Sequence, residues 1–188
     1  MTAPKVDTPK IDPSKSTDKK FAAMPSGEIE VYSQLLQDTG STTPNYKKAL
    51  TDLTTWSRRY PATSFESERA YYYVHVYNAL GQSDMILGAA APLVTAGVAR
   101  VYDDPQRVLQ ILVAASASIQ KIPQPTKLQL STAERAARQL LDFLPDYFAP
   151  SRKPANVTDA AWTIARNQLE AVAKQVIERR PGTLASAR

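Results

Sequence analysis

Hydrophobic and polar positions follow a helical period over most of the chain after Ser26. Apolar residues recur three or four positions apart, which places them on one face of an α-helix. No stretch shows the sustained period-two alternation of a half-buried strand. The pattern predicts about seven helices, at residues 27–38, 44–59, 65–80, 84–97, 105–121, 131–144 and 158–178.

Residues that commonly cap helices stand where several of these helices should begin. Asp104 precedes Pro105, and Ser131 and Glu134 have the spacing of a capping box, in which each side chain bonds the other residue's backbone amide. The other candidate caps are Ser26, Thr43 and Thr158. Because the connections are mostly short, the sequence predicts an all-α fold of stacked antiparallel helical hairpins.

The segment from Tyr71 to Tyr77 has the composition of a strand, since it is rich in tyrosine and valine. Its apolar positions nevertheless fit a helix, because Ala70, Tyr73, Val74 and Tyr77 fall on one face of period 3.6. We therefore expect a helix here, with these four residues on its packing face.

Two segments that lie 84 residues apart share one spacing. In each, a small residue is followed by apolar residues four and seven positions later and by a proline. The small residue lets two helices approach closely, the apolar residues stay on that face, and proline is expected to end the helix. The two sets are Ala49, Leu53, Trp56 and Pro61, and Ala133, Ala137, Leu140 and Pro145.

This spacing resembles the second helix of a tetratricopeptide repeat (TPR). The segment between the two sets is similar to the first helix of the repeat, with its turn glycine at Gly81, and residues 56–81 look like repeats of bacterial envelope-associated TPR proteins. The resemblance implies a TPR-like α-solenoid. Ile86 stands where a small residue is usual, and residues 122–125 form an inserted proline-rich stretch. An unrelated irregular helical bundle is the alternative.

The resemblance also implies where a partner would bind. In TPR geometry Glu68, Tyr71, His75 and Asn78 would face the concave groove, where tyrosine, histidine and asparagine can contact a peptide or a helix of a partner protein by stacking and hydrogen bonding. For His75 the alternative is a partly buried helix residue with one local hydrogen bond.

Charge is distributed unevenly along the chain. The net charge of +5 comes from the ends, because residues 27–178 hold 15 basic and 15 acidic side chains. Residues 1–26 are expected to be a disordered leader, residues 27–178 a TPR-like domain and residues 179–188 a flexible basic tail. The neutral body disfavours nucleic acid as a partner, although the basic ends leave a nucleic-acid-binding or enzyme-accessory domain as the alternative function.

Motifs for catalysis and cofactor binding are missing from the sequence. It has no cysteine, one histidine and no glycine-rich phosphate loop. Asp103 and Asp104 form the nearest acidic pair, and they are better explained as a helix cap before Pro105. The sequence thus predicts no catalytic residue, no metal site, no cofactor and no small-molecule substrate, and it favours a non-enzymatic scaffold or adaptor that binds a protein or peptide.

The sequence leaves the location of the protein open. No apolar run approaches the roughly 20 residues that span a bilayer, so no transmembrane segment is expected. The bacterial periplasm or cell envelope, after processing or truncation of the N-terminus, and the cytoplasm are both compatible with this sequence.

The last predicted helix carries an apolar stripe, which would either cap the array of hairpins or dock another subunit. Self-association through this helix is therefore one expected kind of contact. The stripe comprises Trp162, Ala165, Leu169, Val172, Ala173 and Val176.

The composition of the leader generates a first prediction. Deleting residues 1–24 should leave the thermal midpoint of unfolding nearly unchanged, because these residues have too little apolar surface to offset the entropy of ordering them. Circular dichroism melts of the full and shortened chains provide the measurement. A loss of several degrees would show that the leader packs on the body.

Overall fold

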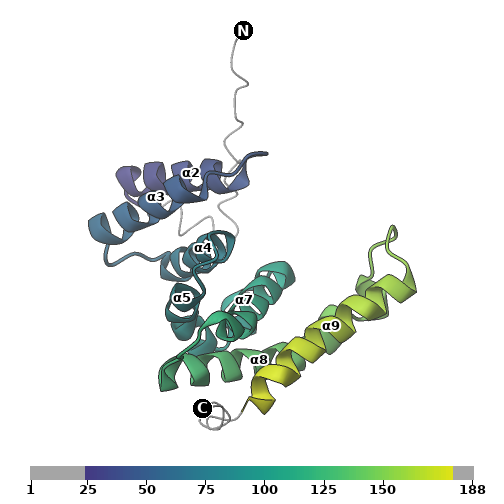
Figure 1. The fold of residues 1–188 in the computed structure, drawn as a ribbon. Coiled ribbons are helices and arrows are strands. Elements are labelled where there is room, and N and C mark those ends of the chain that lie inside the picture. The colour runs from purple at the N-terminus through teal and green to yellow at the C-terminus, as the bar shows by residue number, and fades with distance from the viewer. Residues whose placement is uncertain (1–23, 180–188) are drawn as a thin grey trace. The chain divides into compact units, whose positions relative to one another are not determined.

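The computed structural model describes residues 24–179, and every regular element in that range is a helix (Figure 1). The predicted all-α class is confirmed. Within the described range there is one α-helix more than expected, the short α6. The α-helices are α2 (Ser26–Gly40), α3 (Tyr46–Arg59), α4 (Glu66–Ala79), α5 (Ser83–Ala96), α6 (Val98–Val101), α7 (Pro105–Ser118), α8 (Lys127–Tyr147) and α9 (Asp159–Glu178).

The described helices belong to two compact units, one ending at Glu66 and the other beginning at Ser67. In the first unit α2 packs against α3. In the second, α7 packs against α8, α8 against α9, and α5 against both α7 and α8. The predicted domain of residues 27–178 spans both units, whereas most of the predicted leader and of the basic tail lies outside the described residues. None of the described helices is long and apolar enough to cross a membrane.

The core of the first unit centres on Trp56. Its side chain is fully buried, and its indole nitrogen Nε1 donates a 2.6 Å hydrogen bond to Oε1 of Glu28 on the facing helix. Glu28 is itself only 4% exposed. The ring of Tyr32 lies 5.3 Å from that of Trp56. A buried carboxylate is costly unless it is hydrogen-bonded, so this contact fixes how α2 packs on α3.

The residues that share the repeat spacing are buried on three helices, α3, α5 and α8. Ala49 and Leu53 on α3 are fully buried, as Trp56 is. On α5 the same spacing falls on Ile86, Ala90 and Leu93, of which Ala90 is fully buried and the other two are 2% and 4% exposed. On α8 the fully buried residues at this spacing are Ala133, Ala137 and Leu140. The small residues at these positions let neighbouring helices approach closely.

The start of α8 differs from the prediction. The capping box is formed by Thr126 and Gln129 rather than by Ser131 and Glu134, so the helix begins at Lys127. Ser131 lies inside the helix, and its hydroxyl donates to the carbonyl of Leu128 at 2.9 Å. The sequence contains two sets of residues with capping-box spacing, and the earlier one follows the proline-rich stretch that interrupts the chain.

Other element ends correct the prediction as well. Pro145 does not end its helix, because α8 continues through it to Tyr147, whereas Pro61 lies just beyond the end of α3. The cap of α3 is Asn45, whose side chain accepts from the amide of Lys48, and not Thr43. Met24 is 6% exposed, so the packed part of the chain includes the end of the predicted leader, and the deletion that should leave the thermal midpoint unchanged must end at residue 23.

The predicted packing face of α4 is only partly correct. Val74 and Tyr77 are buried as expected, but Ala70 and Tyr73 are half-buried. Residues that were not expected on the packing face are buried as well: Arg69, Tyr72 and Val76. The helix therefore buries side chains around much of its circumference, so a single apolar stripe does not describe it.

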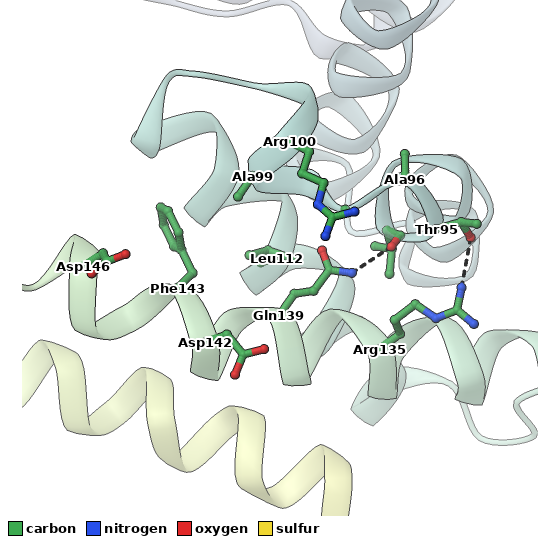
Figure 2. Close-up of a pocket in the computed structure, with 12 residues that line it drawn as sticks. Thr95, Ala96, Ala99, Arg100, Leu112, Arg135, Gln139, Asp142, Phe143 and Asp146 are labelled. Atoms are coloured by element: carbon green, nitrogen blue, oxygen red, sulfur yellow. Dashed lines mark hydrogen bonds between the residues drawn. The ribbon is translucent and has the colours of Figure 1, made fainter.

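A side chain of α8 completes the backbone where α5 ends. Gly97, at a φ of +88°, breaks the helix between Val94 and Val98. In an unbroken helix the amide of Val98 would donate to the carbonyl of Val94. The carboxamide of Gln139 stands between them instead, accepting from the Val98 amide at 3.0 Å and donating to the Val94 carbonyl at 2.7 Å. Figure 2 shows this carboxamide reaching from α8 toward the end of α5.

Trp56 provides a test of the first unit. Trp56→Phe should lower the free energy of unfolding by about 1–3 kcal/mol, since it keeps most of the apolar volume but leaves the buried Glu28 carboxylate without its donor. Trp56→Ala should cost more, about 3–5 kcal/mol or above, because it also opens a cavity. Urea unfolding followed by circular dichroism measures both. An unchanged free energy of unfolding for Trp56→Phe would mean that the hydrogen bond to Glu28 contributes nothing.

Gln139 provides a test of the second unit. Gln139→Ala should lower the free energy of unfolding by about 1–3 kcal/mol, because it leaves a backbone donor and a backbone acceptor without their partner. The control is Arg138→Ala, which removes only an exposed ion pair to Glu134 and should cost under about 1 kcal/mol. Urea unfolding of the two variants gives the comparison. If both lose the same amount, the inserted carboxamide is dispensable.

Candidate functional site

A hollow of about 420 Å³ lies on the second unit, between α4, α7 and α9. Three of the four residues predicted to bind a partner, Tyr71, His75 and Asn78, line it from α4. We call this hollow the groove. Its other lining residues are Val74 of α4, Leu109, Gln110, Ile111, Val113, Ala114 and Ala117 of α7, and Leu169 of α9.

Two side-chain links hold α4 beside α7. Nη1 of Arg107 donates to both carboxylate oxygens of Glu68, at 2.6 and 2.8 Å. The hydroxyl of Tyr71 donates to Oε1 of Gln110 at 2.9 Å. In both links the partners are 39 residues apart in the sequence, so the two helices run in the same direction. Corresponding helices of consecutive repeats are related in this way.

Tyr71 makes several contacts at the groove. Its ring stacks with that of His75 at 6.0 Å, and the guanidinium carbon of Arg107 lies 4.8 Å from its centre. Burial raises the pKa of the Tyr71 hydroxyl, and the cation of Arg107 only partly opposes that shift. The hydroxyl is therefore protonated at neutral pH and serves as a donor to Gln110.

His75 lies half-buried on the groove wall. Burial lowers the pKa of its imidazole below the ordinary value of about 6.5. The ring is thus neutral at pH 7 and offers one donor and one acceptor. No Asp, Glu, Lys or Arg is among the lining residues, so the groove has no formal charge at that pH.

Glu68 does not line the groove, unlike the other three predicted residues. Its carboxylate is held by Arg107, which also lies 3.8 Å from the carboxylate of Asp104. The predicted binding role for Glu68 therefore has no geometric support, because its carboxylate is engaged in joining α4 to α7.

Sequence reasoning missed the far wall of the groove. Gln110 and Ala117 of α7, and Leu169 of α9, were not identified as groove residues. The family resemblance covers the segment that includes α4. The same register 39 residues later in the sequence indicates Gln110 of α7.

A second hollow, of about 470 Å³, opens where α5, α6 and α8 meet (Figure 2). Its lining is charged, with Arg100 and Arg135 among the residues and with Asp142 and Asp146 along α8. Nη1 of Arg135 donates to Oγ1 of Thr95 at 3.2 Å, and Gln139 is engaged by the backbone of α5 and α6. Arg135 and Gln139 thus have structural partners within this hollow.

Among residues 24–179 no group of three or more histidine, aspartate or glutamate side chains is placed to hold a metal ion. Comparison with known proteins gives no match to a family model, to a curated protein or to a solved structure. The resemblance to TPR proteins remains a prediction, and the interpretation of the groove rests on its own geometry.

Proposed function

We propose that this chain is a non-enzymatic protein-interaction module that holds a segment of a partner protein in the groove between α4, α7 and α9. The observation that carries the proposal is the groove itself. It combines apolar lining residues with a few polar groups, in a volume of about 420 Å³.

Two carboxamides give the groove its capacity for hydrogen bonding to a peptide. Asn78 stands on α4 and Gln110 on α7, and both are exposed. Among the described residues, no side-chain hydrogen bond engages Asn78, and Gln110 uses only Oε1, which accepts from Tyr71. A partner's backbone amides and carbonyls can therefore be bound without breaking a contact that holds the fold.

The electrostatics of the groove favour a protein over a nucleic acid as the partner. Binding to a phosphate backbone relies on lysine and arginine at the contact, and the lining of the groove includes neither. Tyrosine and leucine, by contrast, supply buried area in protein contacts, and Tyr71 of α4 and Leu169 of α9 both line the groove.

The proposal predicts that partner binding depends on the two carboxamides. The double variant Asn78→Ala and Gln110→Ala should lose a partner that the unchanged chain retains in pull-downs from the native host. Its midpoint of unfolding should fall only slightly, since both side chains are exposed and the link between Glu68 and Arg107 still holds α4 beside α7 when the one from Tyr71 to Gln110 is lost.

A matched control is available on α9, where Asn167 and Gln168 are adjacent and exposed. The variant Asn167→Ala and Gln168→Ala removes the same two side-chain types outside the groove lining, and it should retain the partner. Equal retention by both double variants would contradict the assignment of the groove as the binding site.

A further inference from the structure

The lining of the groove restricts the chemistry of the segment that it can hold. The groove has no formal charge at pH 7, as its only titratable side chains are Tyr71 and His75. The charges beside Tyr71 are those of Arg107, Glu68 and Asp104, which do not line the groove, and Arg107 is bound to Glu68 by two short hydrogen bonds. A charged side chain entering the groove would therefore lose its hydration without gaining an opposite charge from the lining.

Desolvation makes that restriction strong. Burying an ionised group without a partner is strongly unfavourable, whereas burying an aliphatic side chain is favourable. The floor is made of aliphatic residues, among them Val74, Ile111 and Ala114. The small side chains of Ala114 and Ala117 leave room above α7 for a side chain of the partner.

The polar groups on the walls suit a peptide backbone. Because Oε1 of Gln110 accepts from Tyr71, the remaining Nε2 of Gln110 is a donor that suits a carbonyl. Asn78 on the facing wall offers both a donor and an acceptor. These neutral groups match the neutral amides and carbonyls of a main chain.

We infer that the groove selects an uncharged peptide segment with an aliphatic anchor side chain, whose main chain is held by Asn78 and Gln110. The inference rests on the proposed function and adds the class of partner to it. The aliphatic anchor contacts the floor between Ala114 and Ala117, and charged residues of the partner remain outside the groove.

Selection from a phage-displayed library of random peptides tests the inference with the unchanged full chain. The expected consensus has aliphatic residues at its centre and no Asp, Glu, Lys or Arg there. Binding of a synthetic consensus peptide, measured by isothermal titration calorimetry, should change little between low and high salt. A consensus with a charged central residue, or binding that weakens steeply with salt, would overturn the inference.

Placing a charge on the floor provides a second and independent readout. Ala117→Lys adds a cation near the C-terminal end of α7, where the helix dipole favours it, so the fold should tolerate the change. It should weaken the consensus peptide by at least about tenfold. Repeating the selection with Ala117→Lys should enrich acidic residues at the anchor position.

The matched control is Ala96→Lys, the same substitution in the last turn of α5, at the other hollow (Figure 2). It should bind the consensus peptide as the unchanged chain does. Far-ultraviolet circular dichroism verifies that both lysine variants remain folded, and if Ala117→Lys unfolds, the consensus of the unchanged chain still decides the matter.

The outcomes separate the two proposals. The selected peptides could be charged and fail to bind the double variant Asn78→Ala and Gln110→Ala. That result would support the proposed function and refute the uncharged anchor. If no selected peptide responds to the groove variants, the proposed function fails, and the inference fails with it.

Discussion

The register of α4 beside α7 is the constraint on which the groove depends. Arg107 lies in the first turn of α7, where the positive end of the helix dipole disfavours a cation. The carboxylates of Glu68 and Asp104 supply the opposite charge, and the first of them belongs to α4. The ion pair thus relieves an unfavourable charge and aligns the two helices. One turn further on, the same alignment brings Tyr71 to Gln110.

Polar side chains at helix contacts specify the packing in both units. Glu28 accepts from the buried Trp56, and Gln139 replaces a missing backbone hydrogen bond beside Gly97. Apolar contacts tolerate small rotations and shifts of one helix on another, but a buried polar group must find its partner. Each of these contacts therefore selects one arrangement among several that would bury similar apolar area.

The sequence predicted which segments form the long helices, but it did not predict the side-chain contacts between them. Helical periodicity, and local caps such as Asp104 and Thr158, involve residues a few positions apart, so they are visible in the sequence. Glu28 reads as an ordinary first-turn acid, because its partner Trp56 is 28 residues away. The α4 side of the groove followed from the family resemblance, whereas Leu169 depended on how α9 folds back, which no local pattern encodes.

The contact that Gln139 makes also restricts changes in the length of α8. One residue added to or removed from the part of α8 that precedes Gln139 would turn this side chain by about 100° around the helix axis. The carboxamide would then point away from the gap between Val94 and Val98. Evolutionary changes in this part of α8 should consequently be substitutions. Insertions and deletions should be confined to the loops that precede and follow the helix.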